Sequence, residues 1–150
     1  MPHQHLDADA RTIVDLANDI AHEFELEYVG TEHILLAILR HNGGIGARVL
    51  KKLGVTEKRA RQTLDEIIQR AKEDTWVFGR LPGSPNYRRV IEMAIEEAKQ
   101  LESVKIGSEH LLLGLLREKG TSAEQTLVTL GATLKKCRSE VLHELHASDE

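Results

Sequence analysis

The sequence predicts an all-α domain built from two four-helix repeats, eight helices in total, related by a pseudo-twofold axis. Three observations lead to this prediction. The segment GTEHILLAIL, which begins at Gly30, returns 77 residues later as GSEHLLLGLL, which begins at Gly107. Apolar residues recur at helical spacing around both copies. Aromatic residues make up only 3% of the chain, so the core must consist of Leu, Ile, Val and Ala, as is common where helices pack on helices.

The similarity extends well beyond these two segments. A shift of 77 residues lays 11–70 on 88–147 without a gap, an agreement over 60 positions. Self-similarity of this length indicates a duplicated structural unit. We therefore expect a single domain over 1–150, with repeat one at about 7–73, a linker at about 74–84 and repeat two at about 85–147.

The helices of the first repeat are predicted from their apolar spacing and end signals. The first has an apolar stripe of Ile13, Leu16, Ala17, Ile20 and Phe24. The second is apolar on every side from Ile34 to Leu39, which predicts a central position, and Thr31 is expected to cap it through its hydroxyl. A short third helix over about 45–53 should end at Gly54. Thr56 should cap the fourth helix.

The second repeat follows the same scheme. Its central helix is predicted over Leu111–Leu116, and Thr133 should open its last helix. Between the repeats lies DTWVFGRLPGSPN, whose prolines and glycines indicate a linker. Trp76 and Phe78 in this linker are expected to pin it to the core, and an exposed docking patch is the alternative.

Composition excludes several classes of protein. The net charge is -4 with acidic and basic residues interspersed, so the chain lacks the basic face that nucleic-acid binding requires. No apolar run approaches the length of a membrane span. A single cysteine, Cys137, excludes an internal disulfide and is expected to be a small core residue. The opening MPHQHLDADA lacks the blocks of a signal peptide, so we expect a cytoplasmic location.

Catalytic motifs are missing from the sequence. It contains no G-x-x-x-x-G-K-[ST], no H-E-x-x-H and no cysteine pair, which predicts a non-catalytic protein without cofactor or metal. One alternative is a small enzyme in which symmetry brings together Glu32, His33, Glu109 and His110 as an acid–base or metal-binding cluster. A passive interaction scaffold with no small ligand is another alternative.

The repeated motif resembles a known family. The paired G-[TS]-E-H-[IL]-L-L-x-[IL]-L segments, their L-x-x-L-G ends and the stretch SPNYRRVIEMAIEEA are similar to the Clp N-terminal domain of Clp-type AAA+ unfoldases, closest to the ClpC type. The resemblance covers about 6–145. It implies a module that recruits substrate or adaptor proteins to an ATPase ring, in cis or in trans, and that recognises phosphoarginine. A free-standing adaptor or decoy with this fold and no phosphoarginine binding is the alternative.

The resemblance also implies site residues. Glu32 and Glu109 correspond to the family's acidic residues, and a carboxylate is the natural bidentate partner of a guanidinium. On the phosphate side, Ser84 followed by Pro85 predicts a helix start with free N–H groups. Family members commonly have Thr where this chain has Asp7, whose charge would repel phosphate. The pocket that uses Ser84 is therefore expected to be the better phosphoarginine site.

Two points stay open at this level. The sequence does not show which glutamate shares a pocket with Ser84, and Thr31 and Ser108 are weaker candidates for ligand contact. A purely structural role is the alternative for both glutamates, because an acidic residue in the first turn of a helix stabilises it by about 0.3–1 kcal/mol. His33 and His110 are expected to pack or hydrogen-bond near the helix starts.

Overall fold

The computed structural model describes residues 6–23, 30–75 and 87–149, in which it shows eight helices and no strand. The all-α prediction is confirmed. In chain order the helices are α1 (Ala8–Glu23), α2 (Thr31–Arg40), α3 (Ile45–Lys52), α4 (Glu57–Thr75), α5 (Tyr87–Gln100), α6 (Ser108–Arg117), α7 (Ser122–Thr129) and α8 (Leu134–Asp149). The bounds of the two repeats stay predictions. The predicted linker contacts of Trp76 and Phe78, and the position of Ser84, lie outside the described residues.

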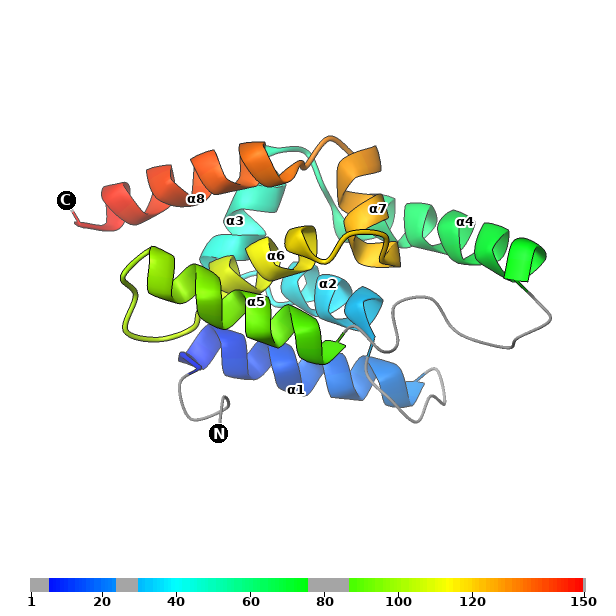
Figure 1. The fold of residues 1–150 in the computed structure, drawn as a ribbon, viewed down its shortest axis with the longest axis horizontal. Coiled ribbons are helices and arrows are strands. Elements are labelled where there is room, and N and C mark those ends of the chain that lie inside the picture. The colour runs from blue at the N-terminus through cyan, green and yellow to red at the C-terminus, as the bar shows by residue number, and fades with distance from the viewer. Residues whose placement is uncertain (1–5, 24–29, 76–86, 150) are drawn as a thin grey trace.

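Helix α6 is the centre of the fold. It contacts α1, α2, α3, α5, α7 and α8, and in Figure 1 it lies behind α5 and between the lower helix α1 and the upper helix α8. Every residue from Ser108 to Leu116 is buried, as expected for a helix that is apolar on all sides. Helix α2 is buried from Thr31 to Ile38. Helix α4 contacts α2 and α7 and extends to the right in Figure 1.

The predicted apolar stripes form one continuous core. Ile13, Ile20, Leu64 and Ala94 are all buried in it. Cys137 is also buried there, and this burial raises the pKa of its thiol to about 12. The interpretation of Cys137 as a small core residue is therefore confirmed, since a reactive thiol requires a lowered pKa and access to solvent.

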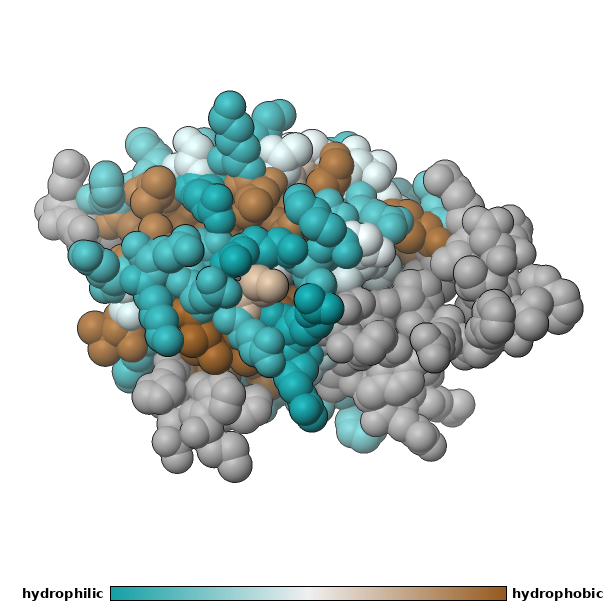
Figure 2. Space-filling view, in the orientation of Figure 1, coloured by the Kyte–Doolittle hydropathy of each residue, from teal (hydrophilic) through white to brown (hydrophobic). Residues whose placement is uncertain are grey.

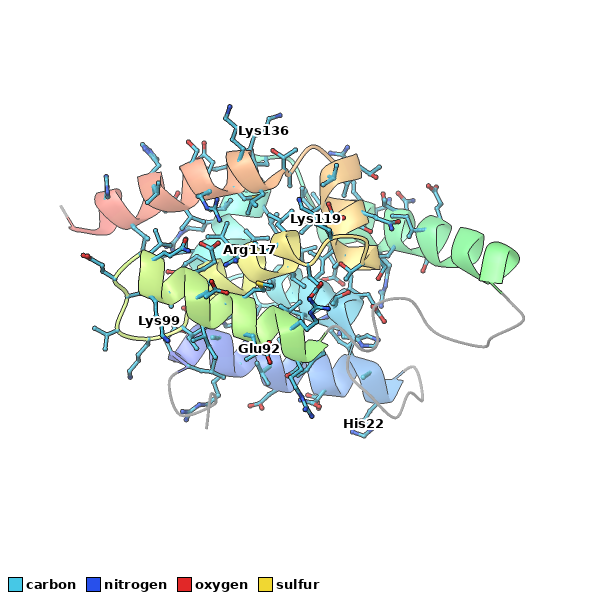
Figure 3. All side chains as sticks on the ribbon, viewed as in Figure 1. His22, Glu92, Lys99, Arg117, Lys119 and Lys136 are labelled. Atoms are coloured by element: carbon cyan, nitrogen blue, oxygen red, sulfur yellow. The ribbon has the colours of Figure 1, made fainter. Side chains whose placement is uncertain are left out.

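Charged side chains cover the outside and link the two repeats. Hydrophilic residues dominate the face in Figure 2, and Figure 3 shows His22 and Lys136 pointing away from the body of the domain. Lys52 at the end of α3 places its Nζ 2.7 Å from a carboxylate oxygen of Glu144 on α8. This ion pair is exposed at the lysine, so its contribution to stability is small. Among the described residues, no helix is both long and apolar enough to cross a membrane.

The predicted caps of two helices are confirmed. Oγ1 of Thr56 accepts the backbone N–H of Arg59 at 3.2 Å, at the start of α4. Oγ1 of Thr133 accepts the N–H of Lys136 at 3.3 Å, at the start of α8. Gly54 follows α3 with a φ of 82°, the left-handed conformation that glycine adopts at low cost after a helix.

Helices α5 and α6 approach each other at Gly114. A Cβ atom added to Gly114 would lie 2.7 Å from the carbonyl oxygen of Val90 and 3.1 Å from the backbone nitrogen of Ala94. These neighbours are backbone atoms of α5, which cannot move without shifting that helix. The close approach of the two helices therefore depends on the missing side chain.

Replacing Gly114 with alanine is expected to lower the free energy of unfolding by about 1–2 kcal/mol, because overpacking at the α5–α6 contact outweighs the better helix propensity of alanine. Urea unfolding followed by circular dichroism measures this change. Gly43→Ala is the matched control, since the nearest atom to its added Cβ would be 3.5 Å away. Equal stability of the two variants would contradict the close-packing argument.

Candidate functional site

Glu32 and Glu109 occupy equivalent positions in the first turns of α2 and α6. Each is the second residue of its helix, after a glycine N-cap, where the positive end of the helix dipole favours a carboxylate. Both are largely buried, with exposed fractions of 6% for Glu32 and 7% for Glu109. Only an edge of each side chain therefore remains in contact with solvent.

The two helix starts are built by glycine and histidine. Gly30 and Gly107 are the N-caps, and the backbone N–H of each donates a hydrogen bond of 2.8 Å to Nδ1 of the histidine three residues later. His33 and His110 thus play the part that Glu or Gln plays in a capping box. Since Nδ1 accepts this bond, the neutral ring carries its proton on Nε2. Burial lowers the pKa of both rings, that of His110 to about 4.

These contacts confirm one prediction and correct another. The histidines hydrogen-bond near the helix starts, as expected. Thr31 is not the cap of α2: it is the first helical residue, and its buried Oγ1 has no hydrogen-bond partner. Gly30 takes the cap position because the carboxylate of Glu32 folds back against it, within 2.8 Å of where a Cβ would be. A side chain at position 30 would collide with that carboxylate.

The surroundings of Glu32 include the start of α7. Oγ of Ser122, the first residue of α7, donates a hydrogen bond of 3.1 Å to Oε2 of Glu32. Nε2 of His33 lies 3.8 Å from Oε1 of the same carboxylate. Burial raises the pKa of Glu32 above its usual value, and hydrogen bonds to the carboxylate oppose this rise. No sequence motif pointed to Ser122, because this contact joins residues 90 positions apart.

The surroundings of Glu109 include the start of α1. A single parallel bridge joins Leu6 to Ile106, in which the N–H of Asp7 donates to the carbonyl of Ile106 at 2.8 Å. This bridge brings Asp7 to the start of α6. A Cβ added to Gly107 would lie 2.8 Å from Oδ2 of Asp7 and would also collide with Oε1 of Glu109. The carboxyl groups of Asp7 and Glu109 therefore meet over the bare Cα of Gly107.

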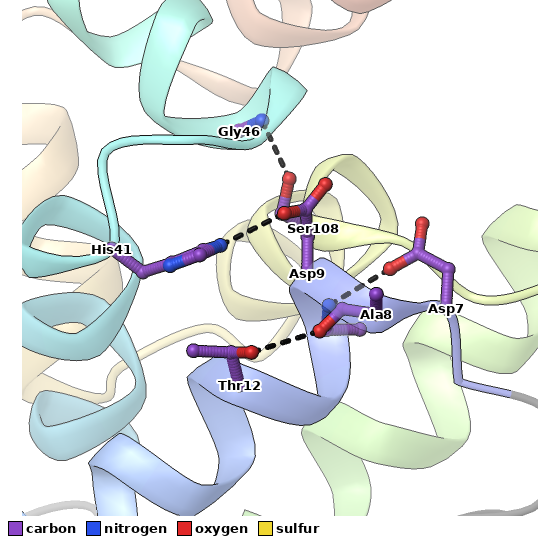
Figure 4. Close-up of polar contacts among 8 residues, drawn as sticks. Asp7, Ala8, Asp9, Thr12, His41, Gly46 and Ser108 are labelled. Atoms are coloured by element: carbon purple, nitrogen blue, oxygen red, sulfur yellow. Dashed lines mark hydrogen bonds and ion pairs between the residues drawn. The ribbon is translucent and has the colours of Figure 1, made fainter.

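Figure 4 shows the starts of α1, α3 and α6 near one another, around Asp7, Gly46 and Ser108, the residue before Glu109. Oδ1 of Asp7 caps α1 by accepting the N–H of Ala10 at 2.8 Å. Oγ of Ser108 accepts the N–H of Gly46 at 2.9 Å, which ties the start of α6 to the start of α3. Asp9 lies 2.8 Å from Nε2 of His41. The hydroxyl of Ser108 is thus already committed to a bond inside the domain.

Like charges distinguish Glu109 from Glu32. Burial raises the pKa of Glu109, and the negative charges of Asp7 and Asp9 raise it further, while Arg48 opposes the rise. The causes that raise the pKa of Glu32 include no neighbouring acid. Two positions that are equivalent in the repeat therefore differ in their electrostatic surroundings.

The described residues provide no support for a catalytic or metal-binding cluster. Glu32 with His33 and Glu109 with His110 sit at two different helix starts, and each histidine uses its Nδ1 to hold a backbone N–H. No group of three or more His, Cys, Asp or Glu in the described part of the chain could hold a metal ion. The capping hydrogen bonds account for His33 and His110, two of the four residues proposed for that alternative.

Comparison with known proteins decides the family. The model of the Clp repeat (R) N-terminal domain matches residues 5–130 and, in a second match, residues 84–149. The chain belongs to the Clp repeat N-terminal domain family. The family suggested by the GTEH-type motifs is thereby confirmed. Two overlapping matches also agree with the internal repeat.

Curated relatives are named as ATP-binding subunits of the Clp protease and as Clp chaperone proteins. The ClpA homolog CD4B of Solanum lycopersicum, an ATP-binding subunit of the ATP-dependent Clp protease, is 41% identical over 138 residues. Chaperone protein ClpC1 of Oryza sativa subsp. japonica is also 41% identical over 138 residues. Each alignment covers 92% of this Clp domain and 15% of the relative. The chain thus spans only a small part of the length of these proteins.

Solved structures with the same fold include N-terminal domains of other proteins. The N-terminal domain of ClpD from Arabidopsis thaliana has a TM-score of 0.71 at 23% identity, with 97% of both chains covered. The Hsp104 N-terminal domain from Candida albicans has a TM-score of 0.63 at 14% identity, over 91% of this chain and 89% of that one. At these identities the likeness shows the fold alone.

The expectation of a cytoplasmic location is wrong by this comparison. The relatives from Solanum lycopersicum, Oryza sativa and Arabidopsis thaliana are named as chloroplastic proteins. The expectation rested on the missing signal-peptide pattern, which concerns secretion and does not distinguish between compartments inside a cell.

Proposed function

We propose that this Clp domain binds segments of substrate or adaptor proteins for a Clp ATPase ring, in cis or in trans, through Glu32 and Glu109. One observation carries the proposal. Both carboxylates are about nine-tenths buried, yet no described Lys or Arg lies within ion-pair distance of either. A buried carboxylate without a cationic partner is costly and is available to one from outside.

A guanidinium is the cationic group best suited to pair with these buried carboxylates. Its planar fork of N–H donors can bind both oxygens of a carboxylate, and the bond is strongest where water is largely excluded. The exposed edge of each glutamate is the surface that such a donor would meet. The positive end of the helix dipole favours the ionised carboxylate at this position. A ligand would therefore meet a negative charge whose position the fold already fixes.

At Glu32 we propose phosphoarginine as the ligand. In the repeat, Ser84 corresponds to Asp7 and Glu32 corresponds to Glu109, a shift of 77 residues in each case. Asp7 and Glu109 meet over Gly107. The repeat therefore supports Ser84 as the phosphate-side residue of the Glu32 site, where no neighbouring acid contributes to the carboxyl pKa.

Calorimetric titration with free phosphoarginine tests this function. We expect binding to wild type and a loss of about tenfold or more in Glu32→Gln, since a hydrogen bond to a charged group contributes about 1.5–3 kcal/mol. Glu109→Gln should lose less. Ser84→Asp should lose more than Asp7→Ala, because it adds a negative charge beside the phosphate. Glu66→Ala, at an exposed position of α4, is the control and should bind as wild type does. No heat with wild type would refute the phosphoarginine proposal.

A further inference from the structure

The Glu109 site is more acidic than a phosphorylated ligand tolerates. Three carboxylates, those of Glu109, Asp7 and Asp9, lie close enough for the two aspartates to raise the pKa of Glu109. Asp7 is the nearest of the two to the helix start, since its Oδ2 would lie 2.8 Å from a Cβ at Gly107. A phosphate brought to Glu109 would meet this negative charge.

The basic side chains near Glu109 are already engaged with other groups. His41 faces Asp9 through a contact of 2.8 Å. The guanidinium of Arg48 lies 3.5 Å from Glu144 on α8 and acts on Glu109 only through its field. No described side chain forms a hydrogen bond or ion pair with the carboxylate of Glu109. Among the described residues, Glu109 is therefore a buried acid without a cationic partner.

One N–H group at each of two neighbouring helix starts is already bonded to a side-chain oxygen. At the start of α1, the N–H of Ala10 is bonded to Oδ1 of Asp7. At the start of α3, the N–H of Gly46 is bonded to Oγ of Ser108. Oxygens of Asp7 and Ser108 thus use two N–H groups that a helix start could otherwise offer to a phosphate.

We propose that Glu109 and Asp7 together form a receptor for an unmodified arginine side chain of a bound protein. The proposal rests on the guanidinium-binding role proposed above and assigns a different ligand to the second site. At the Glu109 site, the second negative charge belongs to the protein and is the carboxylate of Asp7. At the Glu32 site, it belongs to the ligand and is the phosphate of phosphoarginine. Arginine fits better than lysine, because its fork of donors can bond two carboxylates at once, whereas an ammonium acts as a point charge.

The test uses the full 150-residue chain carrying Glu32→Gln, so that only the second site remains, and three short peptides that differ in one residue: arginine, phosphoarginine or lysine. We expect the arginine peptide to bind about tenfold more tightly than the phosphoarginine peptide, the scale of one unfavourable charge contact near a surface. Adding Asp7→Ser should reverse this order. Serine retains the N-cap oxygen of α1, so the fold is preserved, which a thermal melt checks. Asp7→Asn, which removes only the charge, should also remove the preference for arginine.

Four results would overturn this assignment: no binding of the arginine peptide to Glu32→Gln, a preference for phosphoarginine in that variant, equal binding of lysine, or a ratio that Asp7→Ser leaves unchanged. The variant Glu109→Gln retains only the Glu32 site. In this variant, adding Asp7→Ser should not change the affinity for the arginine peptide or for the phosphoarginine peptide. Loss of phosphoarginine binding in that protein, with arginine binding intact in Glu32→Gln, would refute phosphoarginine at Glu32 and support the inference at Glu109.

Discussion

Replacing Glu109 or Glu32 with glutamine is expected to stabilise the folded domain at neutral pH. Burial raises the pKa of both carboxyl groups, so the folded state binds their protons more readily than the unfolded state does. The stability that comes from a protonated carboxyl is fully present below the unfolded pKa and is lost as the pH rises through the raised folded pKa. Glutamine keeps the shape of the side chain and removes the charge that makes burial costly.

The expected gain at pH 7.5 is about 1 kcal/mol, or about 2–4 °C in Tm for a chain of this length. Glu109→Gln should gain more than Glu32→Gln, because Asp7 and Asp9 oppose the ionised form of Glu109 whereas Ser122 donates a hydrogen bond to Glu32. Melting curves at pH 7.5 and at pH 4 measure the effect, which should largely vanish at the lower pH because the wild-type carboxyl groups gain protons. A variant less stable than wild type at pH 7.5 would contradict the argument, and Glu66→Gln on the surface of α4 is the control.

These substitutions should stabilise the fold and weaken ligand binding at the same time. A residue kept for structure alone would lose stability on replacement, whereas a carboxylate held ready for a ligand costs stability in the free protein. The combined result, a higher Tm with weaker binding, therefore separates the binding role from the helix-dipole role.

Glu97→Ala is expected to cause the largest loss of stability, about 3 kcal/mol. Glu97 lies on α5 with an exposed fraction of 1%. Its Oε1 is 2.5 Å from Nη2 of Arg138 on α8 and 3.5 Å from Nη1 of Arg117 on α6. Alanine would remove the carboxylate that the guanidinium groups of Arg117 and Arg138 share, and with it the ion pairs that join α5 to α6 and α8. Urea unfolding measures the loss.

A neighbouring residue offers the matched control for this experiment. Glu96 also faces Arg117, at 3.6 Å, but its side chain is 57% exposed. Glu96→Ala should change the free energy of unfolding by less than about 0.5 kcal/mol, as is typical of exposed ion pairs. If both substitutions had the same small effect, the buried ion pairs of Glu97 would not hold α5, α6 and α8 together.

Much of the fold could be predicted because its signals are local. Apolar spacing predicted the buried stretches of α2 and α6, and Thr56 and Thr133 were correctly placed as caps. The prediction failed for Thr31, where a hydroxyl before an apolar run matched the cap pattern. The glycine before it takes the cap position, since the side chain of Glu32 folds back over that residue and excludes a Cβ atom.

The surroundings of the two glutamates could not be predicted in the same way. The hydrogen bonds that define them join residues 62 positions apart at Ser108 and Gly46 and 90 positions apart at Ser122 and Glu32. Neither helical periodicity nor a short motif predicts a hydrogen bond between residues so far apart in the sequence. The deep burial of both carboxylates, against the usual exposure of Glu, likewise follows from packing between helices.

By itself, the sequence determined that this chain is a duplicated, all-helical Clp domain and that a glutamate lies at the start of each central helix. These features can be recognised because the repeat, the helical spacing and the N-terminal motifs are patterns of residue types along the chain. Only the tertiary structure decided that Asp7 joins Glu109, through the bridge between Leu6 and Ile106, and that Ser122 joins Glu32. The physical reason is that a carboxylate's charge state and readiness for a ligand depend on what packs against it, and packing brings together helix starts that lie far apart in the chain.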